Sequence, residues 1–570
     1  MKQEKMDSLK KALWKGNQGV FAIAFVTYLV ASAINLYLSY ILQVVTDIAA
    51  GVSKERSLGQ VALQVLLVAI GMGIVMISGA KTQNLFYARA MRQYRDDIFR
   101  KLSKKGIGAF RKENTSLYVS GMTNDAAVIE DSYLTGIFTM GQQIFLFAGA
   151  LILMLYYSPL LTLIAIGFSL LPVIASICTG KKLVGLEKEV SDRNQSFLAQ
   201  ISEILMGFSV VKSFKAEERI AKIVGESNEN LESSKRKRNV NKDITSSIGS
   251  FAGASTQIGV FLVGAWMCLK GRGITPGMLF VFTNLLNFII GPIAQLPGVL
   301  AKRKAALSLM EKMEKALMEE RETENLVEDC TLERSVQIDH LTYSYDGKKK
   351  VLDDFSFKFD QGKSYAIVGA SGCGKSTLLQ LLLAGMSGYE GSIRYDGTNL
   401  RRIKPESLYD TVSTIQQNVF VFNASIRDNV TMFKEFAKEE VDRVIDMAGL
   451  RELIREKGED YLCGENGSGL SGGEKQRISI ARALLHNAKL LLVDEATAAL
   501  DAETSSRVIK AILELKDVTR IVVTHDLDAG SLQKYDSILT LKNGKIIEDG
   551  SFDVLMKNKG YFYSLYTVAQ

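Results

Sequence analysis

The sequence of 570 residues predicts two domains of different class, an all-α membrane domain followed by an α/β domain. Three observations support this. Six long apolar runs without charge lie before residue 305, whereas later apolar runs are short and alternate with charged segments. A glycine-rich loop at residues 369–376 separates a short apolar run from a helical pattern. A chain of this length is also expected to hold more than one domain.

Each of the six apolar runs is long enough to cross a bilayer as a helix, which takes about 20 residues. We expect helices at about 20–45, 61–80, 133–157, 159–180, 245–269 and 273–301. A tight turn at Tyr157-Ser158-Pro159 should divide the third helix from the fourth. Pro276, Pro292 and Pro297 should bend or bound the last helix. Runs of this number and length do not suit the core of a soluble protein.

Basic residues indicate how the helices are oriented. The connection 81–131 carries ten lysines and arginines, whereas the loops at the other ends of the helices carry few. Cytoplasmic loops of membrane proteins are enriched in these residues. We therefore expect the N-terminus, the connections 81–131 and 181–244 and the C-terminal domain in the cytosol. Both long connections look helical and should extend the membrane helices beyond the bilayer.

The predicted spans carry no ionisable residue, which argues against a proton-coupled or metal-ion carrier, because such pathways usually need buried charges. Their polar and aromatic residues are uncharged, and we interpret these residues as helix-packing groups rather than as a site. They include Tyr28, Asn35, Tyr37, Tyr40, Gln43, Gln142, Gln143, Asn284, Asn287, Phe288 and Gln295.

Composition excludes further classes of protein. The net charge of +7 is modest and belongs largely to residues that flank the apolar runs, so it does not indicate a nucleic-acid partner. The five cysteines show no C-x-x-C pairing, which argues against a disulfide framework or a zinc site. No cleavable signal peptide is evident, because the first apolar run is too long for one.

Residues 369–377 read Gly-Ala-Ser-Gly-Cys-Gly-Lys-Ser-Thr and fit the phosphate-binding pattern G-x-x-x-x-G-K-[ST]. Small residues let backbone N–H groups converge on a phosphate, and the helix that follows adds the positive end of its dipole. Lys375 should reach the β- and γ-phosphates, and the Ser376 hydroxyl should ligate Mg²⁺. A strand at 364–369 and a helix at 376–383 give the context of a P-loop NTPase. The expected nucleotide contacts are Gly369, Ser371, Gly372, Gly374, Lys375, Ser376 and Thr377.

Two carboxylates follow the short apolar strand expected at 490–493. In a P-loop fold the carboxyl ends of the strands face the nucleotide. Asp494 is therefore placed to hold Mg²⁺, and Glu495 is placed to polarise the attacking water. His525 follows the apolar strand at 521–523, and its place at the same sheet edge favours phosphate contact over a structural role.

Residues 469–477 read Gly-Leu-Ser-Gly-Gly-Glu-Lys-Gln-Arg and open a helix. Ser471, Gly472 and Gly473 could present N–H groups to an anion, as at a helix N-terminus. Taken alone, the stretch fits an N-capped helix after a flexible turn equally well.

The order of these motifs resembles the nucleotide-binding domain of the ABC transporters, and Leu-Ser-Gly-Gly-Glu at 470–474 matches the signature of that family. The resemblance implies that ATP and Mg²⁺ are the cofactors. It implies that Tyr345 stacks on adenine and that Asp501 belongs to the D-loop. It further implies that Gln417 contacts Mg²⁺ and takes part in catalysis, with Glu495 as the catalytic carboxylate and His525 as the switch histidine.

In this family the signature serine, here Ser471, binds the γ-phosphate held by the P-loop of the opposite subunit. A chain with one of each motif is therefore expected to dimerise. Glu474, Cys373 and Ala498 depart from common family residues, but none of these departures removes a catalytic group. The partner is then an identical chain or a related half-transporter.

Six spans ahead of a nucleotide domain resemble the exporter-type (type IV) ABC fold. Within that resemblance, Thr123–Asp125 lies where the first coupling helix sits, and 211–217 matches the stretch near the second. Residues 464–467 resemble a loop that marks exporters. The domains are expected at 1–315 (membrane), 316–334 (linker) and 335–570 (ABC nucleotide-binding).

The function implied is ATP-driven export of a small molecule, lipid or peptide, coupled to ATP hydrolysis, across the inner membrane of a bacterial cell. Membrane lipid and a transported substrate are the other expected partners, and the sequence does not identify the substrate. Two alternatives stay open. One is an importer with the exporter fold, for example for siderophore uptake, and the other is an ATP-gated channel or regulator.

Overall fold

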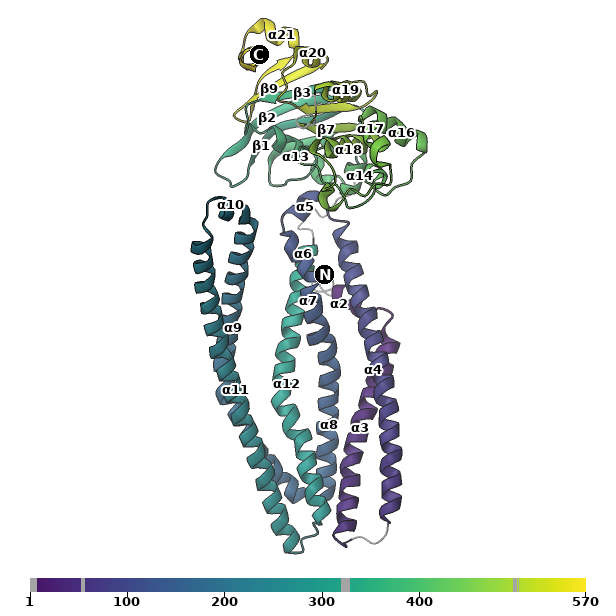
Figure 1. The fold of residues 1–570 in the computed structure, drawn as a ribbon, viewed down its shortest axis with the longest axis vertical. Helices are drawn as coiled ribbons and strands as arrows, with labels where there is room; N and C mark the ends of the chain where they lie inside the picture. Colours follow the sequence, from purple (N-terminus) through teal and green to yellow (C-terminus); the bar gives the residue numbers. More distant parts are fainter. Residues whose placement is uncertain (1–7, 53–56, 319–328, 496–499, 501, 570) are drawn as a thin grey trace. The chain divides into compact units, whose positions relative to one another are not determined.

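The computed structural model describes residues 8–52, 57–318, 329–495, 500 and 502–569. The chain forms two compact units (Figure 1). The first combines residues 1–99 with 116–315, and the second combines 100–115 with 316–570. The sequence analysis placed the segment 100–115 in the membrane domain, whereas its contacts place it with the C-terminal unit.

The first unit is built of helices. They are α2 (Ser8–Trp14), α3 (Gln18–Ala49), α4 (Leu58–Leu102), α6 (Thr115–Met122), α7 (Asn124–Ile129), a π-helical turn (Glu130–Leu134), α8 (Thr135–Tyr157), α9 (Pro159–Met206), α10 (Phe208–Ser213), α11 (Glu217–Leu269) and α12 (Pro276–Leu317). Among the described residues, five helical stretches are long and apolar enough to cross a membrane: α3, α4, Thr115–Tyr157, α11 and α12. The fourth predicted span falls in α9, whose described apolar stretch, Pro159–Leu171, is shorter.

Proline and serine place the boundaries of two of these helices as expected. Ser158 ends α8 and caps α9, because its Oγ accepts the Leu161 N–H at 3.3 Å while Pro159 occupies the first helical position. Pro276 opens α12 in the same way, and the helix continues through Pro292 and Pro297 rather than ending there.

Small residues and amides join the helices. A Cβ on Gly149 or Gly141 of α8 would collide with Leu36 or Phe25 of α3, so these glycines let the two helices approach closely. Amide pairs also bridge helices. Gln143 Nε2 donates to Gln295 Oε1 at 3.0 Å, and Gln257 Nε2 donates to Asn287 Oδ1 at 2.6 Å. For Gln143, Gln295 and Asn287 the interpretation as helix-packing groups is therefore confirmed.

One end of the bundle departs from the expectation of uncharged spans. The helix α3 runs to Ala49, beyond the predicted limit at residue 45, and so includes Asp47, which is 7% exposed. Asp47 Oδ1 accepts the Gly277 N–H at 2.8 Å, and Oδ2 accepts the Thr275 hydroxyl at 2.9 Å. A buried carboxylate thus ties the end of α3 to the start of α12.

The second unit contains two sheets (Figure 1). An antiparallel sheet has the order β2-β1-β4-β5, and a six-stranded sheet has the order β10-β9-β3-β8-β7-β6. In the larger sheet the strands from β9 to β6 are parallel, and β10 is an antiparallel edge. The strands are β1 (Ser335–Ser344), β2 (Lys350–Asp360), β3 (Ser364–Gly369), β4 (Glu390–Tyr395), β5 (Thr398–Asn399), β6 (Val412–Ile415), β7 (Leu490–Asp494), β8 (Thr519–Val523), β9 (Ser537–Lys542) and β10 (Lys545–Gly550).

Short helices cover these sheets. They are α5 (Ile107–Arg111), α13 (Lys375–Leu382), α14 (Pro405–Thr411), α15 (Ile426–Thr431), α16 (Lys438–Met447), α17 (Arg451–Lys457), α18 (Gly472–Leu485), α19 (Ala502–Leu513), α20 (Ala529–Leu532), α21 (Phe552–Asn558) and α22 (Tyr561–Ala569). The apolar strands expected in the middle of a parallel sheet are β7 and β8, which are neighbours and almost wholly buried. Their prediction is confirmed.

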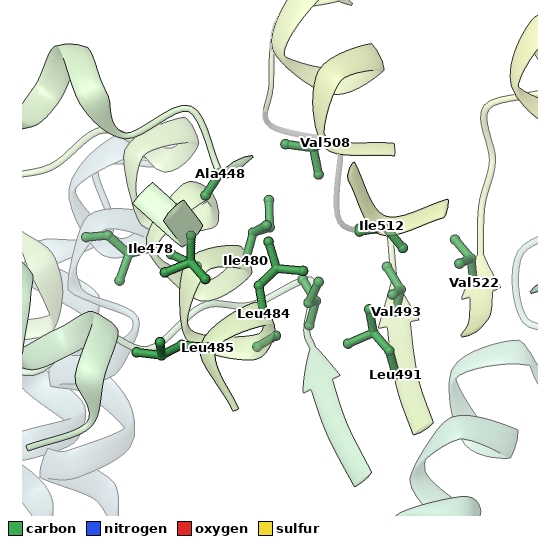
Figure 2. Packing of buried hydrophobic residues seen from close by; sticks show 14 of the residues in the cluster. Ala448, Ile478, Ile480, Leu484, Leu485, Leu491, Val493, Val508, Ile512 and Val522 are labelled. Atoms are coloured by element: carbon green, nitrogen blue, oxygen red, sulfur yellow. The ribbon is translucent and has the colours of Figure 1, made fainter. Parts of the chain in front are cut away.

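A hydrophobic core fixes α18 against the larger sheet. Figure 2 shows Ile480 and Leu484 of α18 close to Leu491 and Val493 of β7. All four side chains are at most 6% exposed. Because apolar burial contributes about 25 cal/mol per Å², this cluster stabilises the packing of α18 against the sheet.

Candidate functional site

Four polar segments meet at the carboxyl edge of the parallel sheet. The loop at 369–374 follows β3, Gln417 follows β6, Asp494 and Glu495 end β7, and His525 follows β8. Since these strands are parallel and adjacent, their carboxyl ends lie along the same edge. Residues separated by more than 100 positions in the sequence are therefore brought together.

The loop after β3 depends on glycine. Gly372 and Gly374 have φ values of +78° and +105°, in the left-handed region that glycine adopts without strain. A Cβ on Gly374 would lie 2.7 Å from the Val351 carbonyl oxygen, so no side chain fits there. Lys375 is 5% exposed, and its Nζ donates to the carbonyl oxygens of Gly369 at 2.8 Å and Ala370 at 3.1 Å. These two hydrogen bonds hold the Lys375 ammonium group at the loop, where its charge can meet a phosphate bound by the loop N–H groups.

A hydroxyl and a carboxylate form a pair beside this loop. Ser376 Oγ donates to Asp494 Oδ1 at 3.0 Å. Burial raises the pKa of the Asp494 carboxyl, and the hydrogen bond from Ser376 offsets only part of this effect. A divalent cation bound here would favour the charged carboxylate.

The Glu495 carboxylate is held on both oxygens. Gln417 Nε2 donates to Oε2 at 2.7 Å, and His525 Nε2 lies 2.9 Å from Oε1. Glu495 itself has a φ of +51°, which is uncommon for a residue with a side chain, and its N–H donates to the Val523 carbonyl oxygen at 3.1 Å. The side chain of Glu495 is 19% exposed, so a water molecule can reach it.

Tyr345 lies next to the first turn of α13. Its hydroxyl is 3.0 Å from Thr377 Oγ1, and its ring meets Tyr343 edge-on with centroids 5.2 Å apart. Since the residue is 63% exposed, most of the ring surface is available for stacking.

Ser471 is the N-cap of α18. Its Oγ accepts the Glu474 N–H at 3.3 Å, and Glu474 Oε2 accepts the Ser471 N–H at 2.6 Å, which completes a capping box. Burial acts to raise the pKa of Glu474, but the hydrogen bonds from Ser471, with Lys457 and Arg477, lower it overall. The capped-helix interpretation therefore holds within one chain. Among the described residues, no hydrogen bond or ion pair joins 469–477 to 369–377.

One predicted site residue cannot be placed, because Asp501 lies outside the described residues. The remaining predicted residues fall into two groups. Gly369, Ser371, Gly372, Gly374, Lys375, Ser376, Thr377, Tyr345, Gln417, Asp494, Glu495 and His525 belong to the sheet edge or its flank, whereas Ser471, Gly472 and Gly473 lie at the start of α18.

The sequence analysis expects the first coupling helix at Thr123–Asp125. Thr123–Asp125 lies in the first unit, as the N-cap and first two residues of α7. The segment that contacts the nucleotide domain is α5, where the Ile107 N–H donates to Tyr409 Oη at 2.8 Å. Arg111 Nη1 also donates to Gln380 Oε1 at 2.6 Å.

The glycine at the centre of α5 explains this contact. A Cβ on Gly108 would lie 2.7 Å from the Ala384 carbonyl oxygen, so the helix approaches the domain through a bare backbone. Gly106 and Gly108, which interrupt the helical pattern after α4, were the sequence signal that could have identified this segment.

Comparison with known families agrees with this organisation. Residues 21–293 match the family described as ABC transporter transmembrane region, and residues 352–498 match the family described as ABC transporter.

Several curated proteins are similar along most of the chain. An uncharacterized ABC transporter ATP-binding protein of Bacillus subtilis, YfiC, is 30% identical over 83% of this chain and 79% of its own length. An ATP-dependent lipid A-core flippase of Desulfotalea psychrophila is 29% identical over 84% of each chain. A beta-(1→2)glucan export ATP-binding/permease protein of Bartonella bacilliformis is 35% identical over 56% of this chain and 55% of its own.

Among solved structures, a bacterial Atm1-family ABC exporter with ATP bound superposes with a TM-score of 0.81. The match covers 97% of this chain and 98% of that one, at 24% sequence identity, and shows that the two share a fold.

Proposed function

The chain belongs to the ABC transporters, and from this premise we propose that it is one half of a dimeric, ATP-driven exporter. It is an integral membrane protein with a fused ATP-hydrolysing domain. The main observation behind this proposal is the position of the Glu495 carboxylate. It is held between Gln417 and His525 at the carboxyl edge of the parallel sheet, where the phosphate-binding loop also begins.

Each residue at the carboxyl edge of the sheet has its own role in ATP binding or hydrolysis. Tyr345 stacks on the adenine, and the loop from Gly369 to Thr377 holds the phosphates with Lys375 as their counter-charge. Glu495 orients and polarises the attacking water, because its carboxylate is accessible to water and is held next to Asp494 at the edge of the sheet. Gln417 and His525 hold that carboxylate and contact the γ-phosphate side of the site.

The donor set suits Mg²⁺. Ser376, Asp494 and Gln417 offer a hydroxyl, a carboxylate and an amide oxygen, which are the hard ligands that this ion prefers. Among the described residues, no cluster of three or more histidine, cysteine, aspartate or glutamate side chains could hold a metal by itself. This agrees with an ion that takes much of its coordination from phosphates and water. Bound Mg²⁺ would neutralise charge on the phosphates.

The separation of Ser471 from the loop within one chain supports the dimer. The serine, with Gly472 and Gly473, meets the γ-phosphate held by the loop of a second copy or of a related chain. Asp501 is proposed to lie at the same dimer contact. The partner's identity is open between these two cases, since this chain has a complete set of catalytic groups.

Export is favoured over import by the relatives. Two of them carry names that describe a flippase and an export protein. Export also agrees with the resemblance of 464–467 to a loop that marks exporters. We place the chain in the inner membrane of a bacterial cell, with the N-terminus and the nucleotide domain in the cytosol, on the strength of the basic connection 81–131.

The decisive test is ATP hydrolysis by this chain alone, purified in lipid nanodiscs. We expect vanadate-sensitive turnover from the unchanged protein. Glu495→Gln should bind ATP normally but hydrolyse it about a hundredfold more slowly or worse, because a positioned base contributes at least that much. Near-normal turnover by Glu495→Gln would refute the role of Glu495.

A second variant tests the loop. Lys375→Ala should lose ATP binding itself, because the phosphates lose their counter-charge. Binding of a fluorescent ATP analogue measures this directly, and unchanged affinity would count against the phosphate-loop assignment. If the unchanged chain binds ATP but does not turn it over, a different half-transporter is its partner.

A further inference from the structure

The first unit contains a cavity of about 750 Å³, and none of the residues that line it belongs to the proposed ATP site. Three helices line it: α3 supplies Tyr37, Tyr40 and Gln43, α8 supplies Tyr156 and Tyr157, and α12 supplies Met278. It lies at the end of the bundle where Ser158 joins α8 to α9 and where α12 begins. In the orientation proposed above, this end faces away from the cytosol.

The wall of the cavity is aromatic. The rings of Tyr37 and Tyr40 stack with centroids 5.9 Å apart, and those of Tyr156 and Tyr157 meet at 5.8 Å with an interplanar angle of 68°. Two ring pairs on different helices thus border one space. Their hydroxyls are largely free, since among the described residues only Tyr37 forms a side-chain hydrogen bond, to Gln64.

A carboxylate lies beside the lining of the cavity. Gln43 Nε2 lies 3.5 Å from Asp47 Oδ2, so a buried carboxylate stands directly behind the lining. In the lining helices, residues 18–46, 135–157 and 276–301 contain no charged side chain, and the Gln43 side chain of the lining contacts the Asp47 carboxylate. On the connection into α12, Arg272 lies over the Trp266 ring, 4.9 Å from its centroid.

This arrangement discriminates between ligand charges. An anionic headgroup would find no lysine or arginine in the lining and would face the Asp47 carboxylate. A cation would be attracted both by the faces of the tyrosine rings and by Asp47. The apolar wall would accommodate an aromatic or alkyl body.

We propose that this tyrosine cavity is a binding site for amphipathic organic cations on the export path of the transporter. The inference deepens the proposed function and rests on it for its meaning in transport, whereas the binding itself needs neither ATP nor hydrolysis. Tyr40 and Tyr156 are the specificity-determining residues, one from each ring pair.

The probe is tetraphenylphosphonium, a rigid cation with four phenyl groups. Its equilibrium binding is measured on the full chain in nanodiscs without nucleotide, with empty nanodiscs as the blank for partition into lipid. We expect saturable binding to the unchanged protein. Tyr40→Leu and Tyr156→Leu should each weaken it about fivefold, because a ring face that attracts the cation is lost.

Two matched variants serve as controls. One tests whether the aromatic ring rather than the hydroxyl of Tyr40 is needed, and the other tests whether binding depends on a ring outside the cavity. Tyr40→Phe keeps the ring face and should bind within about twofold of the unchanged protein. Phe261→Leu removes a half-exposed ring of α11 that lies outside the lining and should bind like the unchanged protein. Tetraphenylborate, an anion of the same shape, should fail to displace the cation.

Three results would overturn the proposal: no saturable binding, equal affinity in both leucine variants and the unchanged protein, or efficient displacement by tetraphenylborate. A failure of the proposed export function would give a different result from a failure of the binding site. It would appear as saturable, tyrosine-dependent binding together with no ATP-dependent accumulation of tetraphenylphosphonium in inside-out vesicles. That result would support the binding site and contradict the proposed export function.

Discussion

At the scale of single residues, the site is built from side chains that constrain one another. Glu495 takes a left-handed backbone conformation that costs about 1–3 kcal/mol and persists only where its surroundings fix it. Here the Val523 carbonyl, Gln417 and His525 fix it from three directions. The carboxylate is therefore pre-organised, and the strain is local to the residue that the proposal makes catalytic.

Tyr345 gives a prediction in which ring and hydroxyl have separate effects. Tyr345→Ala should weaken ATP affinity by about 0.5–1.5 kcal/mol, the usual value of an aromatic stack. Tyr345→Phe should keep most of that affinity, since the hydroxyl bonds Thr377 rather than the base. Titration of purified protein with a fluorescent ATP analogue measures both. Equal losses in the two variants would show that the hydroxyl, and not the stack, matters.

At the scale of elements, sequence patterns predicted the features that depend on residues close together in the chain. The apolar strands β7 and β8, the turn at Ser158 and the glycine-rich loop after β3 all follow from neighbouring residues. The contact of α5 with Tyr409 depends on residues about 300 positions apart, and no pattern near Gly108 reveals its partner. The burial of Asp47 depends in the same way on where α12 begins. Both were missed because tertiary packing, not periodicity, creates them.

Asp396 shows how one side chain can anchor an element. Its carboxylate accepts the N–H groups of Glu333, Arg334 and Ser335 at 2.6, 2.8 and 3.0 Å, where the chain enters β1. Burial acts to raise the pKa of Asp396, but these three hydrogen bonds lower it overall. A carboxyl whose pKa is lowered by folding stabilises the fold above its unfolded pKa of about 3.9, and that contribution is lost as the pH falls through the folded value.

Asp396→Ala should therefore destabilise the nucleotide domain by about 1–3 kcal/mol at pH 7, because three N–H groups lose a charged acceptor. The difference from the unchanged protein should shrink on acidification below about pH 3.9. Calorimetric melting of the full chain at pH 7 and below about pH 3.9 measures the loss of stability at each pH. Asp549→Ala, at an exposed carboxylate, is the control and should melt like the unchanged protein at pH 7. A loss for Asp396→Ala that is the same at both pH values would mean that the charge of the carboxylate is not what anchors β1.

At the scale of the whole molecule, the two halves of the proposed ATP site lie at different places in one chain. The phosphate-binding loop follows β3, and the signature serine caps α18, whose apolar residues belong to the core shown in Figure 2. We propose that Ser471 completes the site of a second chain, which brings its own α18 to the loop. Two-fold symmetry then creates two equivalent composite sites.

Mixing two inactive variants tests this arrangement. In Lys375→Ala the loop is lost, and in Ser471→Arg the signature is blocked. A mixed dimer keeps one intact site, formed by the loop of the Ser471→Arg chain and the signature of the Lys375→Ala chain. Random pairing should therefore restore vanadate-trapped nucleotide to about a quarter of the unchanged level, because half of the dimers are mixed and each has one good site of two. Each variant alone should trap almost none, and co-purification of an untagged chain with an affinity-tagged chain measures how well subunits exchange. If exchange is efficient and the two variants together trap no more than each alone, the composite site is refuted and both motifs act within one chain.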